Sequence, residues 1–115
     1  MEQKSKSWRT AHIRPVTKKV LERVSQGHYN PKIRYIMLFG SEARGEAILT
    51  SDVDIALVSD EPLTRAERLE FTEIFEKESF PDFNVINTLT SDLETDKFTD
   101  VSYHIKREGL VIYER

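Results

Sequence analysis

The sequence contains no cysteine, only four glycines and four prolines, and no long apolar run. The absence of cysteine excludes disulfide bonds and thiolate metal sites. No stretch is apolar over the length that a membrane-spanning helix needs. The polar start MEQKSKS also lacks the apolar core of a signal peptide. We therefore expect a cytoplasmic protein without a membrane segment.

The composition is typical of a folded protein, since 38% of the 115 residues are apolar and 32% are charged. A chain of this length can form one modest hydrophobic core but not two. We expect a flexible polar segment over residues 1–12 and one folded domain over residues 13–115.

The net charge of −3 conceals an uneven distribution of charge. Residues 1–50 carry ten Lys and Arg against four Asp and Glu, whereas residues 51–115 carry seven against sixteen. Two interpretations are open. In the first, charged residues on solvated helix faces are unevenly distributed by chance. In the second, a basic side attracts phosphates while an acidic side meets a basic partner.

Hydrophobic patterns alternate between helix and strand along the chain. A helix is expected from Pro15, and the capping-box patterns TRAE and SDLE predict helix starts at Thr64 and Ser91. The helix from Thr64 is expected to reach about Glu78, and the last helix to end at Gly109. Apolar runs predict strands over 33–39, 53–58, about 83–87 and 110–113. The order α-β-β-α-β-α-β indicates an α/β (α+β) fold, with helices on a small mixed sheet.

Leu69 does not fit the apolar face of the helix expected from Thr64. Phe71, Ile74 and Phe75 form that face at helical spacing, while Leu69 lies nearly opposite. We expect Leu69 to be available for the surface or a partner.

The segment FGSEARGEAILTSDVDIAL, residues 39–57, joins two expected strands. Gly40 and Ser41 follow the first strand, and glycine allows a sharp turn and a close approach to a ligand because it has no Cβ atom. A helix beginning at Ser41 would direct its free N–H groups and its dipole at this turn, which suits a phosphate. Ser41 adds a hydroxyl group and Arg44 a cation.

Asp52 and Asp54 are two residues apart at the start of the next strand, so their carboxylates lie on one strand face. Like charges this close repel each other unless a cation lies between them, and Mg²⁺ prefers such oxygen ligands. The combined pattern predicts a site for a nucleoside triphosphate and Mg²⁺.

These pieces follow one another along the chain as an apolar strand, Gly-Ser, Arg-Gly and Ser-Asp-x-Asp. This order resembles the signature of the DNA polymerase β-like nucleotidyltransferase superfamily. The similarity is greatest to the minimal nucleotidyltransferases of prokaryotes and extends to the closing IKREGLVIYE, so it covers about residues 15–115. It implies the nucleotidyltransferase fold. It also implies that Gly40 and Ser41, assisted by Arg44, hold the triphosphate of ATP.

The same resemblance implies a reaction and a partner. Asp52 and Asp54 would bind Mg²⁺. Members of this family often act as the antitoxin of a small helical HEPN-domain toxin, and several transfer AMP from ATP to tyrosines of that toxin. A HEPN-type helical protein is therefore the implied partner.

The chain departs from the family pattern at the third catalytic position. The superfamily generally uses a third acid from a neighbouring strand, but the corresponding segment is Phe83-Asn84-Val85-Ile86, which puts Asn84 at that place. An amide oxygen can bind a metal, yet it carries no charge and accepts no proton at neutral pH. Asp82 replaces the acid only if a bulge brings it in; otherwise it is a turn residue. The alternative function is an antitoxin that neutralises its partner by contact.

The remaining polar and aromatic residues give weaker signals. The histidines have no metal-ligand spacing and are interpreted as structural or surface residues: His12, His28 and His104. No aromatic stacking series accompanies the basic residues Lys18, Lys19 and Arg23, so nucleic-acid binding is a minor alternative. Trp8 is interpreted either as a partner anchor or as a loosely packed terminal aromatic residue.

Overall fold

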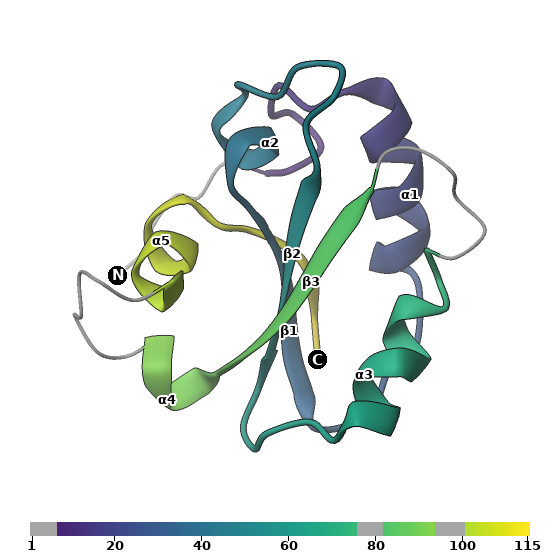
Figure 1. The fold of residues 1–115 in the computed structure, drawn as a ribbon, viewed down its shortest axis with the longest axis vertical. Helices are drawn as coiled ribbons and strands as arrows, with labels where there is room; N and C mark the ends of the chain where they lie inside the picture. Colours follow the sequence, from purple (N-terminus) through teal and green to yellow (C-terminus); the bar gives the residue numbers. More distant parts are fainter. Residues whose placement is uncertain (1–6, 76–81, 94–100) are drawn as a thin grey trace.

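The computed structural model describes residues 7–75, 82–93 and 101–115, and a four-stranded mixed sheet forms its centre (Figure 1). Strand β1 (Ile33–Phe39) pairs antiparallel with β2 (Val53–Ser59) and with β4 (Leu110–Glu114). Strand β3 (Phe83–Leu89) pairs parallel with β2, so that the strand order is β3-β2-β1-β4. The predicted strands and the mixed α/β class are confirmed.

Helices cover both faces of this sheet. Figure 1 shows α1 (Pro15–Ser25) and α3 (Arg65–Thr72) on one side and α4 (Thr90–Leu93) and α5 (Val101–Glu108) on the other. The short helix α2 (Ser41–Arg44) follows β1 directly. Among the described residues, no helix combines the length and apolar character that crossing a membrane requires.

The two-sided core explains why β2 is apolar at nearly every position. Its residues Val53, Ile55 and Leu57 pack in the larger cluster with α1 and α3. Ala56 and Val58, which alternate with them, pack in a smaller cluster with Met37 of β1 and Ile105 of α5. Strands β1 and β2 are therefore the rigid centre of the molecule, and the segment between them is fixed at both ends.

Helix α3 begins as predicted and ends earlier than predicted. Thr64 is its N-cap, with both hydrogen bonds of the capping box present, but the helix ends at Thr72 and not near Glu78, a residue outside the described part. Phe71 is buried and Leu69 is 49% exposed, which confirms that Leu69 lies away from the core face.

Two parts of the last helical region, α4 and α5, lie within the described residues. Helix α4 begins at Thr90, one residue before the predicted capping residue Ser91, while Glu94 of the predicted capping box lies outside the described residues. Helix α5 ends at Glu108, directly before Gly109, as predicted.

The N-terminal residues pack more closely than expected. Trp8 and Ala11 are only 4% and 6% exposed and belong to the larger core cluster. The interpretation of Trp8 as a partner anchor or a loosely packed aromatic is wrong. Trp8 and Ala11 thus pack on the domain that we expected to begin at residue 13. The indole ring has a large apolar surface that the core can bury.

Candidate functional site

The predicted glycine turn lies at the end of β1. Gly40 has φ 80° and ψ −156°, a conformation that is open almost only to glycine. It is followed by α2, which ends at Gly45 in the left-handed conformation (φ 75°, ψ 22°). Hydrogen bonds from Gly45 N to Glu42 O and from Glu46 N to Ser41 O, 3.1 and 2.9 Å long, close this single helical turn.

Gly40 is in close contact with the second predicted aspartate. Phe39 pairs with Asp54 across the β1–β2 ladder. A Cβ atom added to Gly40 would lie 2.2 Å from Asp54 Oδ2, well inside any normal contact distance. The absence of a side chain at residue 40 therefore allows the Asp54 carboxylate to lie directly against the turn.

An open cavity of about 390 Å³ begins at this contact. It brings together Gly40, Ser41, Arg44 and Asp54, four of the residues predicted for the site. Phe39 and two residues of α5, His104 and Glu108, complete its lining. The sequence therefore located most of this cavity but not the wall that α5 contributes.

His104 and Glu108 were not predicted for the site. His104 was interpreted as structural or surface; it is exposed and also lines this cavity, with Nδ1 3.6 Å from Glu108 Oε2. Their i, i+4 spacing was visible in the sequence. The packing of α5 beside α2, which makes the pair part of the site, has no local sequence signal.

Arg44 is already paired inside this cavity. Its Nε donates to Glu46 Oε1 at 2.9 Å and its Nη1 to Glu108 Oε1 at 2.8 Å. Hydrogen bonds to Glu46 and then to Glu108 raise the pKa of Arg44. A phosphate that binds Arg44 must therefore compete with two carboxylates.

The third catalytic position lies beside Asp54. Asp54 pairs with Asn84 in the parallel β2–β3 register, and Asn84 Nδ2 donates to Asp54 Oδ1 at 3.2 Å. Asp82 is exposed, and its carbonyl oxygen accepts a hydrogen bond from Val53 N at 2.9 Å. The register is regular from Phe83 onward. No bulge brings Asp82 toward Asp54 within the described residues, and Pro81 lies outside them.

Asp52 and Asp54 offer carboxylates to a metal ion, although the described residues form no closed metal site. Within residues 7–75, 82–93 and 101–115, no three His, Cys, Asp or Glu side chains are grouped so that they could hold a metal. Asp52 directly precedes β2 and is exposed, and Asp54 is partly buried at the start of β2. Mg²⁺ is commonly held by one or two carboxylates together with substrate phosphates, and this donor set fits that arrangement.

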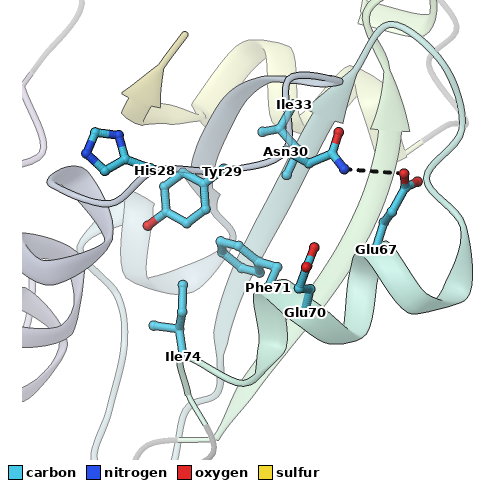
Figure 2. Close-up of a pocket in the computed structure, with 8 residues that line it drawn as sticks. All are labelled: His28, Tyr29, Asn30, Ile33, Glu67, Glu70, Phe71 and Ile74. Atoms are coloured by element: carbon cyan, nitrogen blue, oxygen red, sulfur yellow. Dashed lines mark hydrogen bonds between the residues drawn. The ribbon is translucent and has the colours of Figure 1, made fainter.

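A second cavity, of about 480 Å³, lies between α3 and the residues that follow α1 (Figure 2). It contains none of the predicted site residues. Tyr29, one of its walls, donates its hydroxyl to Val24 O at 2.6 Å, and burial raises the pKa of Tyr29 to about 12.

Two carboxylates, those of Glu67 and Glu70, lie on the α3 wall of this cavity, and Glu67 is also paired. It accepts from Thr64 N at 2.8 Å and from Lys32 Nζ at 3.1 Å. The hydrogen bond from the Thr64 backbone, followed by that from Lys32, lowers the pKa of Glu67. These groups already stabilise the local fold, so we do not assign the chemistry to this cavity.

A known protein family matches most of the chain. The family model described as polymerase beta, nucleotidyltransferase, matches residues 21–115, which include all the residues of the site. A search of the curated proteins finds no match.

Several solved structures are similar to this chain at low sequence identity, and the two with TM-scores above 0.5 share its fold. A toxin–antitoxin complex with AMP-PNP is 21% identical with a TM-score of 0.56, covering 86% of this chain and 71% of that chain. A mutant MntA–HpeT toxin–antitoxin complex is 20% identical with a TM-score of 0.53, covering 90% and 74%. An MNT antitoxin complex with a tri-AMPylated HEPN toxin of Shewanella oneidensis is 19% identical with a TM-score of 0.48, covering 87% and 68%.

Proposed function

This chain belongs to the polymerase beta nucleotidyltransferase family, and from that premise we propose that it transfers AMP from ATP to a hydroxyl group of a partner protein, with Mg²⁺ as the cofactor. The observation that carries the proposal is the contact between Gly40 and Asp54. It puts a turn suited to phosphates directly against a carboxylate suited to Mg²⁺, at the mouth of an open cavity. A site of this kind holds a triphosphate and its metal ion side by side.

In the proposed reaction, the oxygen of the acceptor hydroxyl forms a bond to the α-phosphorus of ATP. The bond between that phosphorus and the bridging oxygen to the β-phosphate breaks, and pyrophosphate leaves. The Ser41 hydroxyl and the free N–H groups at the start of α2 bind the phosphates. Asp52 and Asp54 would hold Mg²⁺, and the ion would supply positive charge beside the phosphate oxygens. The proton of the hydroxyl goes to water, because the Asn84 amide cannot accept it.

A second candidate function is inhibition of the partner by contact alone, and Asn84 is the observation that favours it. Its amide group donates to Asp54 Oδ1 at the position where the superfamily generally has an acid. This bond occupies one lone pair of a carboxylate that the metal requires. The departure weakens activation of the acceptor more than it weakens nucleotide binding.

The proposed partner is a HEPN-type helical protein, for which the chain serves as antitoxin. The support is the resemblance of the sequence and the likeness of the fold to toxin–antitoxin complexes. The acidic second half of the chain suits a basic partner surface and would mainly raise the rate of encounter.

We propose that such a partner makes contact through exposed apolar side chains. Ile48 and Leu49 are 67% and 76% exposed and lie in the segment that leads to Asp52. Leu69 and Val111, which are 49% and 42% exposed, lie on other elements, α3 and β4. We predict that Ile48→Ser with Leu49→Ser weakens the complex at least tenfold by titration calorimetry, because apolar contacts supply most interface affinity. Leu69→Ser with Val111→Ser is the control, and an equal or larger loss there would assign the contact to α3 or β4.

Nucleotide binding is tested by the thermal stability of the chain with AMP-PNP. A ligand that binds only the folded state at a hundredfold excess over its dissociation constant stabilises it by about 2.7 kcal/mol. We expect a rise in Tm with AMP-PNP and Mg²⁺ that EDTA abolishes. The variant Ser41→Ala with Asp52→Ala should lose the rise. A rise of the same size in this variant would place the nucleotide elsewhere.

The two candidate functions separate in cells that express the toxin. Asp52→Asn with Asp54→Asn should abolish protection if protection requires transfer of AMP. The same variant should protect fully if the chain acts by contact. Co-purification of the variant with the partner serves as the control that the complex still forms.

A further inference from the structure

A buried carboxylate lies in the middle of the phosphate-type turn. Glu42 of α2 is 1% exposed, although neither the metal nor the nucleotide is assigned to it. Burying a charge is costly unless it is paired and hydrogen-bonded. Glu42 meets this condition through residues that are far away in the sequence, at the start of α1.

Arg14 is the main partner of Glu42. The Arg14 backbone N–H donates to Glu42 Oε2 at 3.0 Å, and the guanidinium reaches Oε1 through Nε at 2.9 Å and Nη2 at 2.8 Å. Thr17 adds a hydrogen bond from its hydroxyl to Oε1 at 2.8 Å. The Arg14 side chain is 15% exposed, so water competes little for these bonds. They fix α2 to the start of α1.

The same guanidinium also holds the loop between α2 and β2. Arg14 Nη1 donates to the carbonyl oxygens of Ile48 and Leu49 at 2.9 and 3.4 Å, and Nη2 donates to the Ser51 carbonyl at 3.0 Å. The loop closes on itself through Ile48 N, which donates to Ser51 Oγ at 2.9 Å. One side chain therefore connects the turn to the residue directly before Asp52.

The two metal-binding aspartates differ in how they are held. Asp54 is a paired residue of β2, with Phe39 on one side and Asn84 on the other. Asp52 precedes the first residue of β2 and is exposed. The sheet fixes Asp54, whereas the position of Asp52 depends on the loop that Arg14 holds.

We propose that Arg14 and Glu42 are positioning residues that set Asp52 relative to the phosphate turn. This inference rests on the proposed function, since it concerns the metal of that site. Arg14 joins the two parts because its planar group donates to the Glu42 carboxylate and to three carbonyl groups at once. A lysine at residue 14 keeps the charge beside Glu42 but cannot reach all these acceptors.

The test compares Arg14→Lys and Glu42→Gln with Glu67→Gln, which breaks a partly buried ion pair with Lys32 elsewhere in the fold. The first readout is the Mg²⁺ concentration at half-saturation, titrated by calorimetry with AMP-PNP in excess. Residues that orient metal ligands typically change metal affinity about 10–100-fold. We expect at least a tenfold increase for Arg14→Lys and Glu42→Gln and no change for Glu67→Gln. At saturating Mg²⁺, the affinity for AMP-PNP should be unchanged in all three.

The second readout needs no nucleotide. Hydrogen exchange at the amides of residues 46–52 should be faster in Arg14→Lys than in the wild type. Exchange in β1 and β2 should be the same in both proteins. A purely structural role would instead raise exchange throughout the fold. Unaltered exchange in residues 46–52, or an equal loss of Mg²⁺ affinity in Glu67→Gln, overturns the inference. Failure of the wild type to bind Mg²⁺ with AMP-PNP would instead refute the proposed function. If Glu42→Gln does not fold, Arg14→Lys alone decides the matter.

Discussion

Alanine substitutions at Gly40 and at Gly45 can be compared with each other. The comparison separates the effect of backbone strain, which both variants carry, from the effect of displacing Asp54. Gly40 and Gly45 both have positive φ, at 80° and 75°. An added Cβ atom would lie 2.2 Å from Asp54 Oδ2 at residue 40, but 3.2 Å from His12 Cβ at residue 45. Both variants carry strain, and only Gly40→Ala displaces the Asp54 carboxylate.

The expected loss of stability follows from the backbone conformations. A non-glycine residue held in a sparsely populated region costs about 1–3 kcal/mol. For a domain of this size, about 4 °C of Tm corresponds to 1 kcal/mol, so each variant should melt roughly 4–12 °C lower. Gly45→Ala should lie at the lower end, because its contact with His12 needs only a small adjustment.

The response to nucleotide should differ much more than the stability does. At a hundredfold excess over the dissociation constant, AMP-PNP with Mg²⁺ stabilises the folded wild type by about 2.7 kcal/mol, or roughly 10 °C. If displacement of Asp54 weakens binding a hundredfold, the stabilisation falls to about 0.4 kcal/mol, or roughly 2 °C. Gly45→Ala should keep the full rise.

Differential scanning fluorimetry at one fixed concentration of AMP-PNP and Mg²⁺ measures both effects, with EDTA as the blank. A full ligand-induced rise in Gly40→Ala would show that nucleotide binding does not need the Asp54 carboxylate in this position. An equal loss of the rise in Gly45→Ala would show that the effect comes from the turn and not from Asp54.

Three further substitutions test single contacts. Asn84→Asp should raise the rate of AMP transfer at least tenfold in a labelled-ATP assay, because an acid there can accept the proton of the acceptor; an unchanged rate would show that another group does so. Glu108→Gln should tighten AMP-PNP binding several-fold by calorimetry, because it removes a charged competitor for Arg44; weaker binding would mean that Glu108 orients the site. Glu67→Gln should lower Tm at pH 7, because hydrogen bonds lower the pKa of Glu67 below its ordinary 4.5. The lowered pKa of Glu67 stabilises the fold above about pH 4.5, and this stabilisation is lost as the pH falls through the lowered pKa. The difference in Tm between Glu67→Gln and the wild type should therefore vanish in acid. A difference in Tm that persists in acid would rule out the carboxylate charge as its source.

The sequence predicted the centre of the fold because its signals there are local. The apolar runs of β1 and β2 and the capping box at Thr64 depend only on neighbouring residues, and the structure confirms them. The glycine turn and Asp54 were identified for the same reason. Their contact follows from the antiparallel register of β1 and β2, in which Phe39 pairs with Asp54.

The parts of the site that the sequence did not reveal depend on residues far apart in the chain. Arg14 and Glu42 are 28 residues apart, and Arg44 and Glu108 are 64 apart. Charged side chains are common on helices, and nothing in their local spacing distinguishes these pairs from solvated ones. Trp8 was misjudged for a similar reason, since a single aromatic residue in a polar segment has no periodicity that indicates burial.

Transfer of AMP at this site is a claim that can be tested by following the α- and γ-phosphates of ATP. The chain is incubated with Mg²⁺, the HEPN-type partner and ATP that is radiolabelled in either the α- or the γ-phosphate. Asp52→Asn with Asp54→Asn is the control. Transfer of AMP predicts label on the partner from α-labelled ATP, none from γ-labelled ATP, and none from either in the control. Label from the γ-phosphate, or no label on any protein while the wild type still binds AMP-PNP with Mg²⁺, would contradict the claim.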